Sequence, residues 1–367
     1  MLLEEMLGLI ERLAPGGLAQ EWDNSGLLVG DEKAAVERVL VALELDEAVV
    51  GEALAGGFDT IITHHPLLFT PIKSLVESNH KERLLRKLVA GDIALVACHT
   101  NVDASSGGLA DIAAEALGLQ KTEPLVPASA GWHKLVAYIP VDATEAVAEA
   151  VFAAGGGGVG NYSGCAFRVE GQGLFTPGEG SRPVVGKVGL SERTREDRWE
   201  TVVPRHRLGE VVRAFVAAHP YEEPAFDLYA VEDVLPGVGI GRVGALTEEC
   251  SVRSLAQKAL EQFGASRVVW SGDGERTVQR AAVLPGSGRG SIREAAGRCE
   301  ALITGDLSHH DAEEAEDVDL ALVDVPHGEI EWWAFRRWSE TLDKELAGQG
   351  VLLSASKKWV SPWNVIV

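Results

Sequence analysis

The chain has 367 residues, 46% of them hydrophobic and 24% charged, which is the composition of an ordinary globular protein long enough for two domains. Its formal net charge of −22 argues against a protein that binds nucleic acid through a broad basic face. The four cysteines are far apart and form no CxxC pair, which argues against a sulfur-based zinc site and against a disulfide framework.

The N-terminal segment, residues 1–17, sets glutamates among apolar positions at helical spacing. This pattern predicts an amphipathic helix and not a secretory signal. No apolar run is long enough to span a membrane. We therefore expect a cytoplasmic protein with no membrane partner.

Residues 36–100 alternate between strands and helices. Apolar runs predict strands at 36–45, 58–66 and 93–100, and helices are predicted at 46–57 and 79–92. Continuous apolar strands separated by helices indicate a mostly parallel sheet that is covered on both faces. Such sheets place ligands and catalytic groups beyond the carboxyl ends of their strands.

The middle of the chain has a different order of elements, β-α-β-β-α-β. The predicted elements are a strand at 133–142, a helix at 143–158, a strand or hairpin at 165–177, a strand at 199–206, a helix at 207–220 and a strand at 225–233. This order is that of a ferredoxin-like unit. We place the unit at 128–235, between the loop-like segments 124–131 and 235–244.

Alternation resumes after the middle segment. The predicted elements are strands at 266–272 and 281–288, a helix at 291–299, strands at 300–306 and 319–325, a helix at 329–347, and short strands at 351–356 and 363–367. The simplest architecture is one α/β domain with a mostly parallel sheet, built from residues 1–127 and 236–367. The ferredoxin-like α+β domain at 128–235 interrupts it.

Two adjacent histidines, His64 and His65, end the strand predicted at 58–66. Side chains alternate between the faces of a strand, but the chain turns where the strand ends, and Pro66 favours an extended conformation at His65. Two imidazoles can then diverge from one place, which suits two metal ions better than one. Taken alone, the pair is better explained as capping or solvent-facing histidines.

Two further clusters of histidine and carboxylate residues follow predicted strands in the same way. Asp103 lies four residues beyond His99 in a polar loop, although it could instead cap the following helix. His327 and Glu331 are four residues apart and would share one face of a helix, a spacing also typical of a surface ion pair. Imidazoles and carboxylates together suit zinc, iron, manganese or cobalt. The three clusters at corresponding strand exits therefore predict a site for two divalent ions.

Other polar residues near strand exits are candidates for further roles. His99 is predicted to orient a metal ligand. In the segment TGDLSHHDA, Asp306 is a second supporting candidate and His310 could act as a general acid or base, although a helix cap explains the segment almost as well. The glycine loop at 284–294 could receive an anion, but it lacks the Lys-Ser/Thr ending of a P-loop. Its candidate anion-binding residues are Gly288, Arg289 and Arg293.

Five motifs together resemble the GTP cyclohydrolase I type 2 homologue family, also called the Nif-three-like dinuclear-metal family. They are WDNSGLLVG (22–30), THHPLLF, HTNVDASSGGLAD, ITGDLSHHDA (303–312) and the His327/Glu331 pair. The middle segments GNYSGCAFRVEGQGLFTPGEGS and AHPYEEPAFDLY are similar to the inserted domain of the longer bacterial members, which resembles the PII/CutA fold. The resemblance covers essentially the whole chain.

The resemblance implies two divalent ions per subunit, with zinc, iron or manganese as candidates and carboxylates as bridges. The implied ligands are His64, His65, Asp103, His327 and Glu331. The expected supporting residues are Asp23, His99 and Asp306. A homohexameric toroid is also implied, with the metal sites facing an internal cavity.

We therefore expect a metal-dependent hydrolase that acts on a nucleotide or a similar small molecule, with GTP ring opening suggested by the family name. The alternative is a non-catalytic metal-binding or regulatory protein whose inserted domain senses a ligand. Both stay open because a fold and a site do not fix a substrate.

Overall fold

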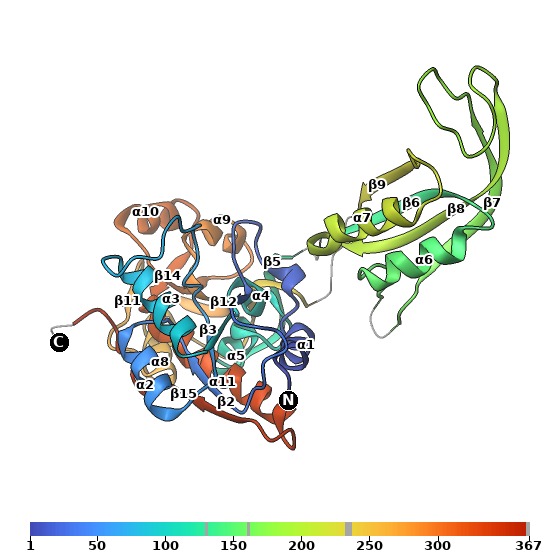
Figure 1. Ribbon diagram of the computed structural model, residues 1–367. Helices are drawn as coiled ribbons and strands as arrows, with labels where there is room; N and C mark the ends of the chain where they lie inside the picture. The colour runs from blue at the N-terminus through green and yellow to red at the C-terminus, as the bar shows by residue number, and fades with distance from the viewer. Residues whose placement is uncertain (129–130, 160–161, 232–236, 365–367) are drawn as a thin grey trace. The chain divides into compact units, whose positions relative to one another are not determined.

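The structure is a computed structural model that describes residues 1–128, 131–159, 162–231 and 237–364. The chain divides into two compact units (Figure 1). The terminal unit is built from both ends of the chain, Met1–Ala128 and Leu235–Val367, and the middle unit from Ser129–Val234. The domain boundary predicted at residues 235 and 236 lies outside the described residues.

One sheet of the terminal unit has five strands in the order β1-β4-β3-β2-β15. They are β1 (Gly26–Val29), β4 (Ala94–Ala97), β3 (Thr60–Thr63), β2 (Arg38–Ala42) and β15 (Leu352–Ala355). The β1–β4 pair is antiparallel and the other three pairs are parallel.

Helices cover both faces of this sheet. They are α1 (Leu3–Leu13), α2 (Glu47–Gly56), α3 (His80–Ala90) and α11 (His327–Leu346). Val39 and Val96 belong to the core that includes α1 and α11. Leu40 and Leu95 belong to the opposite core, with α2 and α3. Burial on both faces explains why these strands read as continuous apolar runs.

A second sheet of the terminal unit has six strands in the order β11-β14-β13-β12-β10-β5. They are β11 (Val269–Trp270), β14 (Ala321–Asp324), β13 (Ala301–Gly305), β12 (Thr277–Ser287), β10 (Gly239–Ser251) and β5 (Leu119–Pro127). The β14–β13 and β13–β12 pairs are parallel and the other three are antiparallel. Its covering helices are α5 (Leu109–Ala116), α8 (Val252–Phe263), α9 (Ile292–Ala295), α10 (His309–Asp317) and α11.

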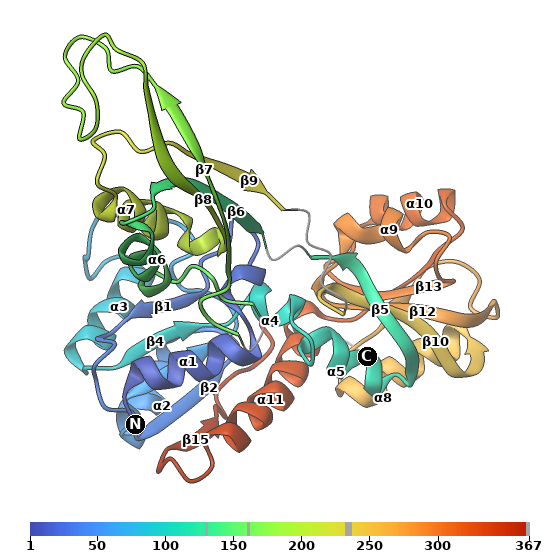
Figure 2. The same cartoon turned by 90° about the vertical axis from the view of Figure 1, so that its right-hand side faces the viewer.

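Helix α11 lies between the two sheets (Figure 2). Its Phe335 and Trp338 belong to the core of the five-stranded sheet, and their rings stack with centroids 5.3 Å apart. Its Ile330 belongs to the core of the six-stranded sheet. Helix α11 follows β14 of the six-stranded sheet in the chain. It therefore brings the residues at its start to the edge of the five-stranded sheet where the parallel strands have their carboxyl ends.

Both units contain further helices of five residues or fewer. In the terminal unit they are η1 (Gly16–Leu18), α4 (Thr100–Ala104) and η3 (Arg289–Ser291), and in the middle unit η2 (Arg205–Arg207). Throughout the described ranges, no helix combines the length and the apolar character that a membrane crossing requires.

Parts of the terminal unit differ from the sequence prediction. The sequence predicts one mostly parallel sheet, whereas the structure has two sheets, the second of them mixed. The segments 124–131 and 235–244, predicted as loops, contribute to β5 and β10, which pair with each other. Their prolines and glycines conceal the strand pattern, and proline is tolerated here because β5 is an edge strand. The strand predicted at 363–367 is wrong at residues 363 and 364, and its last three residues lie outside the described part.

The middle unit has a four-stranded antiparallel sheet in the order β7-β8-β6-β9. Its elements in chain order are β6 (Trp132–Pro140), α6 (Thr144–Ala153), β7 (Ala166–Phe175), β8 (Glu192–Pro204), α7 (Leu208–Ala218) and β9 (Phe226–Ala230). Both helices pack on one face of the sheet, where Trp199 and Phe215 are buried among aliphatic side chains. The β8 strand starts seven residues before the predicted strand at 199–206, because its charged first half has no apolar signal.

Candidate metal centre

Polar side chains gather where β3 and β4 end and α11 begins. His64 and His65 follow β3 directly, and His99 follows β4 by two residues, just before α4, which carries Asp103. The backbone N–H of His64 and His65 still donates to the carbonyls of Ala42 and Leu43, so both histidines remain tied to β2. The parallel pairing of β2, β3 and β4 thus brings these side chains to one edge of the sheet.

Glu331, on the second turn of α11, is the centre of the cluster. Its Oε2 lies 2.9 Å from Nε2 of His65 and 2.9 Å from Nε2 of His327. Its Oε1 lies 3.5 Å from Nε2 of His64, which in turn lies 3.8 Å from Oδ1 of Asp103. The structure therefore brings together all five side chains that the sequence proposes as metal ligands.

His64 is held by one ring nitrogen, while its other ring nitrogen has no hydrogen-bond partner. Its side chain is fully buried, and its Nδ1–H donates to the carbonyl of Cys98 at 2.8 Å. The other nitrogen, Nε2, points into the cluster, 3.5 Å from Oε1 of Glu331 and 3.8 Å from Oδ1 of Asp103. Both Nε2 of His64 and Oδ1 of Asp103 are buried without a hydrogen-bond partner. Such atoms are rare in folded proteins, and a cation held between the two would satisfy both.

Two groups of ligand atoms are close enough to share an ion. One contains His64, His65 and His99, the other His65, His327 and Glu331, and within each group all the atoms lie within 4.8 Å of one another. Nitrogen and carboxylate oxygen are donors that first-row divalent metals accept. These largely buried histidine and glutamate groups could therefore hold a metal ion.

Two carboxylates orient the outer histidines. Oδ1 of Asp23 lies 2.7 Å from Nδ1 of His99, and Oδ2 of Asp306 lies 2.8 Å from Nδ1 of His327. Burial alone would raise the pKa of Asp23, but hydrogen bonds from His99 and Thr100 hold it well below its usual range. A carboxylate on one ring nitrogen leaves the other free for a metal, the arrangement common around metal-binding histidines.

The cluster balances its charges internally. Burial alone would raise the pKa of Glu331, but His64 and the hydrogen bonds from His327 hold it well below its usual range. Burial alone would lower the pKa of His65 and His327, but their hydrogen bonds to Glu331 raise these pKa values to about 10 and about 9. Burial also raises the pKa of the Asp103 carboxyl to about 6. Protonated imidazoles thus compensate the buried carboxylate, a role that a cation can take over.

The sequence profile of the Duf34/NIF3 (NGG1p interacting factor 3) family matches residues 1–358. The chain belongs to the Duf34/NIF3 family. Relatives from Bacillus subtilis and Mycobacterium tuberculosis, each called GTP cyclohydrolase 1 type 2 homolog, are 37% and 36% identical to it. The first match covers 88% of this chain and 87% of the relative, the second 99% and 97%.

Solved structures of two bacterial proteins resemble the whole chain. The Bacillus cereus protein related to NIF3 is 35% identical, with a TM-score of 0.70 over 100% of this chain and 99% of that one. Staphylococcus aureus protein SA1388 is 26% identical, with the same TM-score of 0.70 and the same coverage. The resemblance in sequence and in structure therefore extends over both units of this family member.

Other residues proposed from the sequence lie outside this cluster. The His310 side chain is 88% exposed and pairs with Glu313 on its own helix, so its contacts give no support for a role as general acid or base. Arg289 and Arg293 lie 3.7 Å and 2.6 Å from carboxylates of α10, Asp311 and Glu314. A Cβ at Gly288 would meet Oγ1 of Thr304 at 2.4 Å, so packing against β13 already accounts for this glycine. An anion site in this loop stays a prediction.

The structure also shows contributors that the sequence did not single out. Glu44 lies 3.3 Å from Nδ1 of His65, and a Cβ at Gly286 would lie 2.4 Å from Oε1 of Glu331. Trp22 and Phe69, 58% and 46% exposed, lie with ring centroids 5.7 Å apart, and the rings of Trp22 and His99 are in a T-shaped contact. Glu44 ends the apolar run of β2, a signal of the kind used for His64. The contact of Gly286 depends on tertiary packing and leaves no sequence pattern.

Proposed function

We propose that this protein is a metal-dependent hydrolase that binds two divalent ions and acts on a nucleotide-like small molecule. The observation that carries the proposal is the pair of buried, unpartnered atoms, Nε2 of His64 and Oδ1 of Asp103, beside the carboxylate of Glu331. The residues that would hold the ions are His64, His65, Asp103, His327 and Glu331.

When bound, a pair of divalent ions supplies a water of lowered pKa and a Lewis acid for a phosphate or carbonyl oxygen. The protein's own contribution is preorganisation. Asp23 and Asp306 hold the outer imidazoles by their Nδ1 atoms, and Cys98 holds His64 in the same way. Each Nε2 therefore faces the cluster before any ligand arrives, so little rearrangement is needed on binding.

Two observations support a substrate with a planar ring. The exposed ring of Trp22 lies beside His99 and beside the exposed ring of Phe69, and exposed aromatic side chains of this kind stack on heteroaromatic bases. The relatives carry the name GTP cyclohydrolase 1 type 2 homolog, which extends to this chain only as part of the proposal. A purine nucleotide is therefore the first substrate to test.

Metal analysis tests the site separately from turnover. Protein purified without chelators and then titrated with zinc, iron or manganese should bind two ions per chain, as measured by plasma mass spectrometry after dialysis. His64→Ala should lose at least one ion, whereas His80→Ala, an exposed histidine at the start of α3, should keep both. Retention of both ions by His64→Ala would defeat the ligand assignment.

Turnover is tested with the loaded protein. GTP and other purine nucleotides should be converted to new products resolved by chromatography, and a chelator should stop the conversion until metal is restored. If two ions bind but no nucleotide is converted, the result supports the metal site and contradicts the proposed hydrolase activity.

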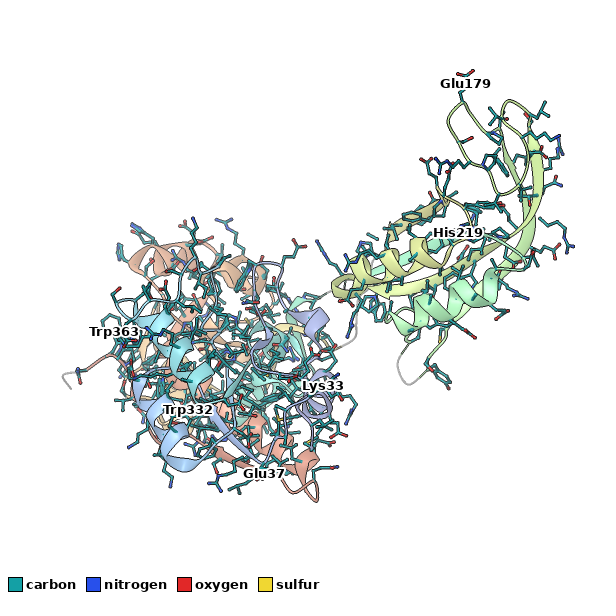
Figure 3. The ribbon with its side chains drawn as sticks, in the orientation of Figure 1. Lys33, Glu37, Glu179, His219, Trp332 and Trp363 are labelled. Atoms are coloured by element: carbon teal, nitrogen blue, oxygen red, sulfur yellow. The ribbon has the colours of Figure 1, made fainter. Side chains whose placement is uncertain are left out.

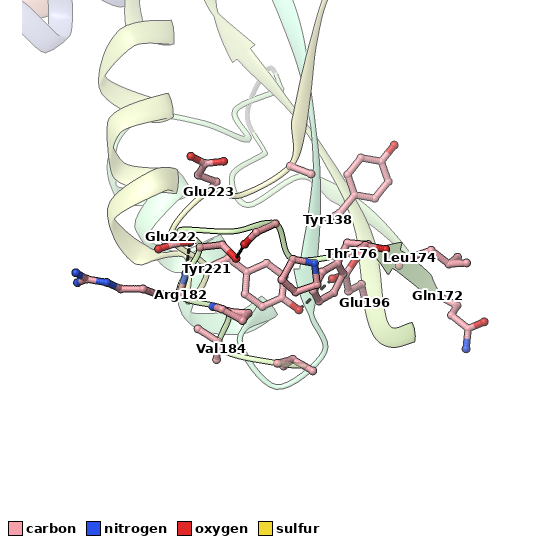
Figure 4. A pocket seen from close by; sticks show the side chains of 18 of the residues that line it. Tyr138, Gln172, Leu174, Thr176, Arg182, Val184, Glu196, Tyr221, Glu222 and Glu223 are labelled. Carbon is pink, nitrogen blue, oxygen red and sulfur yellow. Dashed lines mark hydrogen bonds between the residues drawn. The ribbon is translucent and has the colours of Figure 1, made fainter. Parts of the chain in front are cut away.

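A second candidate function is that of a non-catalytic metal-binding or regulatory protein whose middle unit senses a ligand. The observation that favours it is a cavity of about 610 Å³ in the middle unit, a volume typical of small-molecule sites (Figure 4). The strand order β7-β8-β6-β9 with two helices on one face supports our proposal that this unit is a ferredoxin-like, PII/CutA-like module.

The assembly and location expected from the family resemblance are also proposals. A cytoplasmic homohexamer would have a mass six times the chain mass of 39.1 kDa. Light scattering on the purified protein measures this mass directly, and a monomer or dimer at micromolar concentration would contradict it. The four free cysteines are compatible with a reducing compartment.

A further inference from the structure

The cavity of the middle unit lies against the sheet at the end of the β7–β8 hairpin. It is lined by strand residues and by parts of two connecting segments, 176–178 with 181–185 and 221–223 with 225. Figure 4 shows Tyr221, Glu196 and Thr176 together in the cavity wall, with the hydroxyl of Tyr221 directed at the carboxylate of Glu196. The volume of about 610 Å³ is large enough for a drug-sized or metabolite-sized molecule.

Glu196 is a buried carboxylate in the lining of the cavity. The residue is 8% exposed, and its Oε1 accepts a hydrogen bond from the hydroxyl of Tyr221 at 3.1 Å. Within the part of the chain that the structure describes, no lysine, arginine or histidine pairs with it. Burying an ionised carboxylate is unfavourable unless a cation or several hydrogen-bond donors compensate it.

The backbone around Glu196 is shaped to accept this side chain. Gly171 is its direct partner across the β7–β8 pair, and a Cβ at Gly173 would lie 2.1 Å from its Oε2. Any larger residue at position 173 would therefore displace the carboxylate. Glycine at this position of a strand weakens the strand itself, so its presence fits a close approach by another group.

The two arginines that line the cavity do not neutralise Glu196. Nε of Arg198 donates to Glu200 at 2.8 Å, so its charge is already paired. Arg182 is exposed, and its backbone N–H donates to Glu222 at the cavity wall. An anionic ligand would thus face the buried charge of Glu196 with only an exposed guanidinium to attract it.

Aromatic rings provide the other walls. The rings of Phe175 and Tyr221 lie with centroids 6.2 Å apart, and Tyr138 lines the same cavity. His219 fixes two of these residues, because its Nδ1 accepts from the N–H of Tyr221 and its Nε2–H donates to the carbonyl of Tyr138. A carboxylate next to aromatic faces is the combination that recognises organic cations, through a charge-assisted hydrogen bond and cation–π contact.

We propose that the middle unit binds a small organic cation, an ammonium or amidinium group on a compact apolar body, with its charge on Glu196 and its body against Tyr221 and Phe175. This inference rests on the second candidate function, ligand sensing by the middle unit, and names the class of ligand. It does not depend on the metal centre.

An isosteric probe series tests the charge preference on the unmodified full chain. Benzamidine, benzamide and benzoate share a ring and differ in charge, so calorimetric titration isolates the effect of the charge. Benzamidine should bind about tenfold or more tightly than benzamide, since a hydrogen bond to a charged group contributes that much, and benzoate should not bind. Equal binding of benzamidine and benzamide, or tighter binding of benzoate, would overturn the proposal.

Variants then locate the site. Glu196→Gln keeps the shape and the contact with Tyr221 but removes the charge, so benzamidine should lose about tenfold in affinity and approach benzamide. Glu179→Gln, at an exposed position in the loop between β7 and β8, is the matched control and should bind like the unmodified chain (Figure 3). Unchanged benzamidine binding in Glu196→Gln would overturn the assignment. Glu331→Gln should leave benzamidine binding intact, and its loss there would place the cation at the metal centre instead.

Discussion

Replacing Gly286 by alanine should disable the metal centre without altering any proposed ligand. Gly286 lies near the end of β12, and a Cβ there would meet Oε1 of Glu331 at 2.4 Å. Ordinary contacts of this kind begin near 3.4 Å, so the carboxylate would have to retreat by about 1 Å. Metal–ligand distances tolerate only about 0.2 Å. The displacement is therefore several times larger than a metal site accepts.

The same substitution also strains the backbone. Gly286 has a φ of +86°, a region that costs a residue with a side chain about 1–2 kcal/mol. For a unit of this size that penalty lowers the melting temperature by a few degrees. We expect Gly286→Ala to remain folded at 25 °C and to bind metal at least tenfold more weakly than the unmodified chain.

Metal content after dialysis, measured by plasma mass spectrometry, and the melting temperature with and without chelator form the assay. Gly290→Ala is the matched control, because a Cβ there meets nothing within 4 Å and the residue lies close by in η3. It should keep its metal and lose little stability. If Gly286→Ala retained as much metal as Gly290→Ala, the position of the Glu331 carboxylate would not govern binding and the reasoning would be refuted.

The geometry of the cluster leads to three further predictions. Asp306→Asn should weaken metal binding about 10–100-fold by releasing Nδ1 of His327, and an unchanged affinity in a competition titration would contradict the orienting role. Trp22→Ala should weaken GTP binding by about 1–3 kcal/mol while leaving the metal content intact, and loss of metal instead would show a structural role. Metal affinity should rise with pH, because the pKa values of about 10 and about 9 mean that His65 and His327 carry protons at neutral pH that an entering ion must displace. Calorimetry in buffers of different ionisation enthalpy should detect proton release at pH 7.5, and a buffer-independent heat would contradict it.

The strands that position His64 and Asp103 were predictable because they are buried on both faces. Short apolar runs between helices, such as those of β3 and β4, are typical of strands in a covered parallel sheet, and parallel pairing places their ends at one edge. The polar residues after them, His64 and Asp103, could therefore be expected to lie close together. The distance of 3.8 Å between His64 Nε2 and Asp103 Oδ1 agrees with that expectation.

The positions of His327 and Glu331 depend on tertiary packing, which the periodicity of the sequence does not encode. The spacing of His327 and Glu331 predicts a shared helix face, but not that α11 lies between two sheets and reaches the edge of the other one. The second sheet itself was missed because β5 and β10 begin or end in glycines and prolines that resemble loops. The contact of Gly286 with Glu331 joins residues far apart in the chain, so no local pattern reveals it.

Anomalous diffraction from crystals grown without added metal, recorded across the zinc, iron and manganese absorption edges, is the most direct test of the central claim. Two peaks are predicted among His64, His65, Asp103, His327 and Glu331, each in contact with at least one carboxylate oxygen. Density maps with no anomalous peak in this cluster after soaking with each metal, or with a metal bound only elsewhere, would contradict it.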